Sequence, residues 1–127
     1  MKRASAKAEA STAVDVVLDS GHTVRFDEPS SNGGEDLGPS ATEGVSAALA
    51  ACTVATMRLY ADRKEWDVTG VEVEVSTEYR DHSPSHFRVD LKFPETLDEE
   101  QVGRLKVIAA KCPVHKILAG SVPVDVR

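Results

Sequence analysis

The stretch that decides the fold runs from residue 38 to residue 75 and reads GPSATEGVSAALAACTVATMRLYADRKEWDVTGVEVEV. It opens with Ser40 followed three residues later by Glu43, a pattern typical of a capping box at a helix N-terminus. Inward-facing positions then recur at helical spacing as far as residue 63 or 64: Val45, Leu49, Cys52, Thr56 and Leu59. The final part alternates valine with glutamate, which is typical of a strand with one face in water. The stretch predicts a long helix followed by a strand.

Further elements are expected on both sides of this stretch. Residues 13–27 read as a hairpin, and the Gly- and Pro-rich residues 27–40 read as a long loop that is either functional or mobile. A strand over residues 67–79 should pair antiparallel with one that carries Phe87 to Phe93, its acidic face meeting Arg88 and Lys92. The remaining expected elements are a helix that starts at Asp98 with Gln101 completing a second capping box and that Pro113 ends, a short helical turn over 113–119, and a last strand over 122–126.

Length and composition point to one α+β domain. The chain has 127 residues, of which 41% are apolar, and we expect a single domain over 1–127 with residues 1–12 as its least ordered part. The net charge of −6 argues against nucleic-acid binding. No signal-peptide-like or membrane-spanning apolar run is evident, so we expect a cytoplasmic protein without a membrane partner.

The two cysteines, Cys52 and Cys112, are not needed as a crosslink in a domain of this size. Both fall on the apolar stripes of predicted helices, so they are either buried, inert thiols or, if the stripes meet, a redox pair. Cys112 precedes Pro113 and therefore occupies an N-cap position, where amide hydrogens favour a thiolate. Cys52 lies mid-helix and needs an activating charge from another segment, for which Arg25 is a candidate.

A second motif, LDEEQVGRLKVIAAKCPVHKIL at residues 97–118, follows the first in order. Together with the preceding loop GGEDLGPS, the two motifs resemble the OsmC/Ohr family of osmotically inducible and organic hydroperoxide resistance proteins, over nearly the whole chain from residue 22. The resemblance implies an α+β fold in which antiparallel sheets wrap around two long central helices. It also implies an intertwined homodimer.

The same resemblance implies a thiol peroxidase. Cys52 would attack an organic hydroperoxide and become a sulfenic acid, and Cys112 would resolve it as a Cys52–Cys112 disulfide. An external dithiol, such as a lipoyl-type reductant, would then reduce the disulfide. No metal, nucleotide or other cofactor is implied.

Two supporting residues depart from the family pattern. Its peroxidatic members hold the first cysteine with a glutamate at the start of the helix and an arginine between the first two strands. Glu43 stands nine residues before Cys52, and Thr42 occupies the position ten residues before it. The segment that should carry the arginine has none, so Arg25 and Arg3 are the candidates to replace it.

Other interpretations stay open at this stage. The chain could be a catalytically silent relative whose pocket binds a small apolar or thiol-reactive ligand, with the cysteines as pocket lining. The spacing of Cys112 and His115 is half of a metal motif, but a metal site needs three or four ligands, and the other histidines fall near turns. Trp66 follows the long helix and is expected to pack in the core or at an interface.

Overall fold

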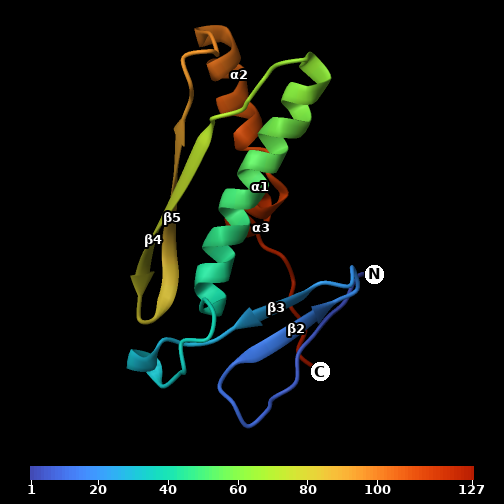
Figure 1. Ribbon diagram of the computed structural model, residues 1–127, viewed down its shortest axis with the longest axis vertical. Helices are drawn as coiled ribbons and strands as arrows, with labels where there is room; N and C mark the ends of the chain where they lie inside the picture. The colour runs from blue at the N-terminus through green and yellow to red at the C-terminus, as the bar shows by residue number, and fades with distance from the viewer. The chain divides into compact units, whose positions relative to one another are not determined.

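The structure, a computed structural model, describes residues 1–127 and confirms the α+β class (Figure 1). The chain divides into two compact units, Met1–Val45 and Ser46–Arg127. In chain order the elements are β1 (Ala4–Ser5), β2 (Val14–Leu18), β3 (Thr23–Phe26), the 3₁₀ helix η1 (Ser30–Asn32), α1 (Ala41–Lys64), β4 (Glu72–Arg80), β5 (Ser83–Lys92), α2 (Glu99–Ala109) and α3 (Pro113–Ala119).

The first unit holds a three-stranded antiparallel sheet in the order β1-β2-β3. The expected hairpin over residues 13–27 is confirmed as β2 and β3, with Asp15 directly opposite Arg25. Gly21 lies in the connecting turn with φ +90°, a conformation that glycine adopts without strain. Strand β1 extends this sheet through the pairing of Ala4 with Leu18 and of Ser5 with Val17.

A buried carboxylate organises the long loop after β3. Asp27, 4% exposed, accepts hydrogen bonds from the Thr12 hydroxyl at 2.8 Å and from the backbone N–H groups of Glu28 at 2.8 Å and Leu37 at 3.1 Å. Gly34 lies so close to the carbonyl of Glu28 that a Cβ would overlap it. The loop is therefore built around specific contacts at both of its ends.

The second unit contains the β4–β5 hairpin, which has the expected antiparallel pairing. Val73 faces Leu91 and Val75 faces Val89. Asp81 and His82 connect the strands with φ +51° and +66°, the two positive values that a tight type I′ hairpin turn requires. The strands are therefore joined by a turn whose twist matches their own.

The charges on the outer face of the hairpin match the expectation only in part. Glu72 is opposite Lys92, as oppositely charged neighbours should be, but Glu74 is opposite Asp90 and Arg88 is opposite Ser76. The expected start of the first strand at residue 67 is wrong, because β4 begins at Glu72. Thr69 N–H bonds the Asp67 carboxylate at 2.9 Å and Gly70 has φ +93°, so this segment turns before the strand begins.

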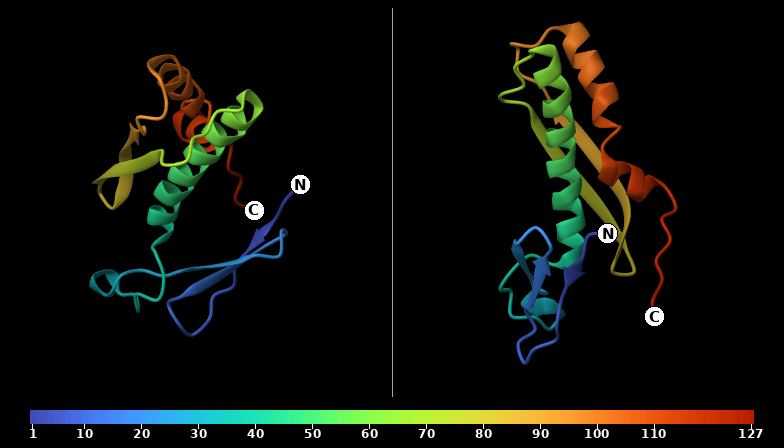
Figure 2. Two further views of the ribbon diagram at one scale, coloured as in Figure 1. Left: turned by 45° about the horizontal axis from the view of Figure 1, so that its top comes forward. Right: turned by 90° about the vertical axis from the view of Figure 1, so that its right-hand side faces the viewer.

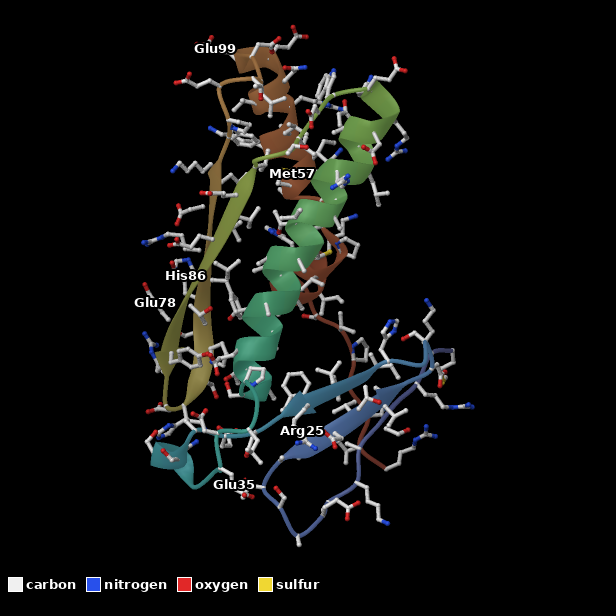
Figure 3. All side chains as sticks on the ribbon, in the orientation of Figure 1. Arg25, Glu35, Met57, Glu78, His86 and Glu99 are labelled. Atoms are coloured by element: carbon white, nitrogen blue, oxygen red, sulfur yellow. The ribbon has the colours of Figure 1, made fainter.

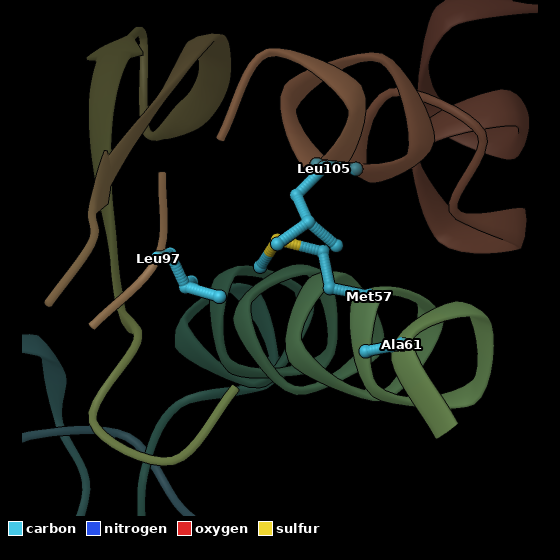
Figure 4. Close-up of a cluster of buried hydrophobic side chains, with 5 residues drawn as sticks. Met57, Ala61, Leu97 and Leu105 are labelled. Carbon is cyan, nitrogen blue, oxygen red and sulfur yellow. The ribbon is translucent and has the colours of Figure 1, made fainter. Parts of the chain in front are cut away.

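Helix α1 begins and ends where the sequence indicates. Within the second unit it runs alongside the hairpin, with α2 beside its C-terminal half (Figures 1 and 2). The core here joins Met57 and Ala61 of α1 to Leu105 and Ala109 of α2 and to Leu97 (Figure 4). The helix thus packs through one stripe against both neighbouring elements.

The inward face of α1 differs from the predicted one. The buried positions are Leu49, Thr53, Met57 and Ala61, each four residues after the last. Leu59, predicted to be inward, is 65% exposed. Cys52 therefore lies on the flank of the buried stripe, where it is half-buried.

Helix α2 has the predicted capping box, in which Asp98 accepts from the Gln101 N–H and Gln101 accepts from the Asp98 N–H. The helix ends at Ala109, so the expectation that Cys112 belongs to its apolar stripe is wrong. Turn-type bonds from Lys111 N–H to the Ile108 carbonyl and from Cys112 N–H to the Ala109 carbonyl replace the helical pattern. Cys112 lies in the joint before α3, although it is fully buried as expected.

The last strand expected over 122–126 is also absent, because residues 121–127 form no element. Val124 is 85% and Val126 95% exposed. A strand requires a neighbour to satisfy its backbone N–H and C=O groups, and these residues have none within this chain.

Opposite its buried stripe, α1 exposes a second face of small and apolar side chains. Its members are Ala47, Ala48, Ala51, Val54, Ala55 and Leu59. By length and composition alone the helix could cross a membrane, which is weak evidence because the core helix of a soluble protein passes the same test. Only 22% of its most apolar window is buried within this chain.

Candidate functional site

Cys52 lies in the middle of α1, where the helix fixes the direction of its side chain. Its Sγ lies 3.9 Å from Oγ1 of Thr56, one helical turn further on. Residues four apart lie above one another on a helix surface, so the two side chains meet without any long-range contact. The sulfur is held by its own helix, and Cys52 as a residue is half-buried.

Cys112 is positioned by the joint between α2 and α3. It is the N-cap residue of α3, with Pro113 at the first helical position, as the sequence predicts. Its carbonyl accepts from the Lys116 N–H at 3.1 Å, and its side chain has no exposed area. The chain therefore presents this thiol inward from a turn.

The two thiols come together from separate parts of the second unit. Both are free, and they lie close enough for each to shift the pKa of the other. The prediction that the two cysteines approach each other in space therefore agrees with the structure. Since they are the only cysteines of the chain, they form its one potential redox pair.

Their surroundings shift the two pKa values in opposite directions. Burial raises the pKa of Cys52, but hydrogen bonds from Cys112, from the Val114 backbone and from Thr56 together lower it below the usual thiol value. Burial raises the pKa of Cys112, and its bond to Cys52 raises it further, whereas the backbone of His115 and Val114 lowers it by less. Cys52 is therefore the thiol that ionises first.

Arg25 is bound within its own sheet. Arg25 lies on β3 (Figure 3), and its Nε and a terminal nitrogen donate to the two carboxylate oxygens of Asp15 at 2.7 and 2.9 Å. This two-point pairing raises the pKa of Arg25 and lowers that of Asp15. The Arg25 guanidinium is about half exposed. The alternative candidate, Arg3, donates its backbone N–H to the Asp19 carboxylate.

Glu43 forms the capping box that the sequence predicts. Its carboxylate accepts from the Ser40 N–H at 3.0 Å, and its own N–H donates to the Ser40 hydroxyl at 3.1 Å. The arrangement satisfies two N–H groups that the first turn of α1 leaves without helical partners. The local role of Glu43 is therefore to start α1.

A partly open pocket of about 420 Å³, with both apolar and polar lining residues, lies among α1, β5 and α3. Its lining includes Leu49, Phe87 and Val89, with His115 at its α3 wall. No three His, Cys, Asp or Glu side chains of the chain are grouped so that they could share a metal ion. Trp66 packs edge-on against Tyr60 at a ring separation of 5.7 Å, in agreement with a packing role.

Sequence reasoning missed two contributors to the site. Thr56 was assigned to the inward face only as a packing position, and the backbone of Val114 was not considered. The hydroxyl four residues after Cys52 was a readable signal, because that spacing places two side chains on one helix face. The Val114 backbone had no such signal, since its approach to Cys52 depends on tertiary structure.

Residues 33–127 match the family of OsmC-like proteins. No curated protein matches the chain by sequence.

Solved structures resemble the chain over most of its length. They include a putative osmotic stress induced and detoxification response protein from Psychrobacter arcticus 273-4, with 22% identity, 91% of this chain and 87% of that chain covered, and a TM-score of 0.81. An OsmC-like protein from Mycoplasma pneumoniae has 16% identity, coverage of 94% and 88%, and a TM-score of 0.79. The organic hydroperoxide resistance protein OhrB of Bacillus subtilis has 20% identity, coverage of 94% and 91%, and a TM-score of 0.60.

At these identities the structural likeness shows a shared fold. The family match covers the long helix, both cysteines and everything between them. The chain belongs to the OsmC-like protein family.

Proposed function

We propose that this protein is a thiol-dependent peroxidase that reduces organic hydroperoxides to alcohols. The observation that carries the proposal is the pair of free thiols that act on each other, one with a lowered and one with a raised pKa. Some structural neighbours of the chain are named organic hydroperoxide resistance proteins, which supports the choice of substrate.

Accessibility and acidity assign the two roles. Cys52 is partly accessible and has the lower pKa, so it is the nucleophile that a hydroperoxide meets. Cys112 is fully buried and stays protonated longer, so it is suited to react with a neighbour inside the protein. This is the division between peroxidatic and resolving cysteines.

The chemistry then runs in three balanced steps. The Cys52 thiolate attacks the terminal oxygen of ROOH, the O–O bond breaks, and ROH leaves after protonation while Cys52 becomes a sulfenic acid. Cys112 loses its proton and attacks the Cys52 sulfur, which releases water and forms the disulfide. An external dithiol reduces the disulfide to two thiols and is itself oxidised.

The pocket among α1, β5 and α3 supports a hydroperoxide with a hydrocarbon tail, because Leu49, Phe87 and Val89 line it, although neither cysteine does. Leu49 on its wall lies on the same helix as Cys52, and His115 on the same short helix that Cys112 caps. The proposal includes a dithiol or lipoyl-type reductant, no metal or organic cofactor, and a cytoplasmic location, where thiols are kept reduced.

The proposal also includes a homodimer in which the exposed face of α1 is covered by a second copy. That face is built from alanines with Val54 and Leu59, and small side chains allow two helices to approach closely. Burial of such an apolar face is favourable by about 25 cal/mol per Å². Light scattering across a dilution series should give twice the chain mass.

Arg25 and Glu43 enter the proposal as the cation and carboxylate that support Cys52. In the structure each has a partner of its own, Asp15 for Arg25 and Ser40 for Glu43. If the Arg25 guanidinium stabilises the Cys52 thiolate, Arg25→Ala removes that positive charge and should raise the Cys52 pKa. An unchanged pH profile of alkylation would remove Arg25 from the site.

The decisive experiment treats the reduced protein with less than one equivalent of cumene hydroperoxide. We expect two thiols to disappear for each hydroperoxide consumed and the intact mass of the oxidised fraction to fall by about 2 Da, as a disulfide requires. Cys52→Ser should abolish the change, and Cys112→Ser should stop at a sulfenic acid about 16 Da heavier. Slow or absent oxidation would contradict the proposal and favour a catalytically silent ligand-binding protein.

A further inference from the structure

Two threonines on α1 use their hydroxyls differently. Thr53 donates to the carbonyl of Leu49 at 2.7 Å, the usual bond of a helical threonine to the residue four positions earlier. Thr56 directs its hydroxyl at the side chain of the residue four positions earlier, with Oγ1 at 3.9 Å from Cys52 Sγ. One hydroxyl is therefore used by the backbone, and the other is available to a sulfur.

The groups whose hydrogen bonds lower the pKa of Cys52 are neutral. They are the Cys112 thiol, the backbone of Val114 and the Thr56 hydroxyl. Cys112 is the titratable group that faces Cys52, and His115, on the same short helix, lines the neighbouring cavity. In a partly buried site an anion depends on such donors, because burial removes stabilisation by water.

Of the two side-chain donors, only Thr56 remains unchanged during a reaction cycle. In the proposed function Cys112 gives up its proton when it attacks the Cys52 sulfur, so its thiol cannot be a donor in that step. The Thr56 hydroxyl neither ionises nor reacts, and the rigid turn of α1 carries it at a fixed offset from Cys52. It also limits the rotation of the Cys52 side chain through its bond to Sγ.

We propose that Thr56 is a positioning residue for Cys52, whose hydroxyl donates a hydrogen bond to the thiolate and holds Sγ in place opposite Cys112. The inference rests on the proposed function for its chemical purpose. The hydrogen bond from Thr56 would stabilise the Cys52 thiolate in any reaction in which that thiolate takes part.

The test compares Thr56→Val, which removes the hydroxyl while keeping the side-chain shape, with Thr56→Ser, which keeps a hydroxyl. Thr53→Val is the matched control, because the same substitution there removes a hydroxyl used by the backbone. The readout is the rate at which iodoacetamide alkylates Cys52 as a function of pH, followed by the mass of the Cys52 peptide. Circular dichroism checks folding, and Thr56→Ala replaces Thr56→Val if that variant is unfolded.

We expect Thr56→Val to move the alkylation profile to higher pH and to reduce the rate at pH 7 by about three- to tenfold, as loss of one hydrogen bond to an anion implies. Thr56→Ser and Thr53→Val should follow the wild-type profile. An unchanged profile in Thr56→Val, or an equal shift in Thr53→Val, would overturn the inference.

The outcome is separate from that of the proposed function. If hydroperoxide does not oxidise the wild-type protein but Thr56→Val still shifts alkylation, the peroxidase proposal fails and the Thr56 inference stands. If hydroperoxide forms the disulfide at the same rate in Thr56→Val and in wild type, with the same alkylation profile, the peroxidase proposal stands and Thr56 has no positioning role.

Discussion

Asp27 in the first unit and Cys52 in the second are both held mainly by neutral hydrogen-bond donors, and both have a pKa below the ordinary value. They differ in how completely the donors surround them. Asp27 is 4% exposed, with both carboxylate oxygens bonded at 2.8 to 3.1 Å. Cys52 is only half-buried and has a looser contact at 3.9 Å. The fully enclosed carboxylate of Asp27 stabilises a loop, whereas the partly enclosed thiol of Cys52 is left able to react as a nucleophile.

The largest expected effect separates the two regions. Cys52→Ser should abolish oxidation by hydroperoxide, since the nucleophile is gone, and leave the melting temperature nearly unchanged. Asp27→Ala should lower the melting temperature by several degrees, because the N–H groups of Glu28 and Leu37 lose their hydrogen-bond acceptor. It should leave the alkylation rate of Cys52 unchanged. Calorimetry and alkylation kinetics on both variants test this. A loss of Cys52 reactivity in folded Asp27→Ala would break the comparison.

The same substitution at the two threonine donors gives a more graded test. Thr12→Val removes the hydroxyl bonded to Asp27 at 2.8 Å and should reduce the free energy of unfolding by about 1–2 kcal/mol. Thr56→Val should cost less stability, because a hydroxyl–sulfur contact is weak, while it slows alkylation. Urea denaturation measures the first effect. If Thr56→Val proved more destabilising than Thr12→Val, the tighter hydrogen bonding of Asp27 would not explain why Asp27 supports the fold and Cys52 reacts.

Acidity gives a third test. Burial raises the pKa of Asp27, but bonds from Thr12 and from the backbone of Leu37, Glu28 and Glu35 outweigh it and lower the pKa. A carboxylate with a depressed folded pKa adds stability above its unfolded pKa of about 3.9, and that stability is lost as the pH falls through the folded value. The Asp27 contribution should therefore persist at pH 5 and disappear only in stronger acid. Acid titration of wild type against Asp27→Ala measures it, and a contribution already lost at pH 5 would contradict the lowered pKa.

The smallest expected effect concerns neither anion. Glu65 follows the end of α1 with φ +60°, a left-handed conformation that is costly for a residue with a side chain. Glu65→Gly should raise the free energy of unfolding by about 0.5–1 kcal/mol, with Cys52 alkylation and the acid titration unchanged. Urea denaturation checks the gain, and Glu65→Ala, which keeps a Cβ, should not reproduce it.

Local signals predicted the elements that local contacts determine. Both capping boxes and the first hairpin follow from residues a few positions apart, and all are present. The prediction of a strand over 122–126 was wrong. Alternating side chains indicate the two faces of a strand, but they do not show whether a neighbouring strand is present to pair with its backbone. The inward stripe of α1 was misplaced by a quarter turn, since small residues such as Ala47 and Ala51 fit either a buried or an exposed face.

The site was predictable to a similar degree. The approach of the two cysteines was predicted from two helices that share a core, but Cys112 reaches Cys52 from the joint before α3 and not from the apolar stripe of α2. The unequal pKa values of the two cysteines could not be predicted, because these depend on the backbone of Val114 and on burial that only the packed structure determines. Thr56 was visible in the sequence but was interpreted as a packing position.

The joint that holds Cys112 has a mechanical consequence. Residues 110–112 belong to no helix, whereas Cys52 lies inside a continuous ladder of α1 backbone hydrogen bonds. When two sulfurs move from hydrogen-bonding to bonding distance, the more compliant side yields. The joint can take up that displacement through a few backbone torsions while α1 stays straight. Repeated oxidation and reduction would then change the backbone torsions of residues 110–112, between α2 and α3, and leave α1 unchanged.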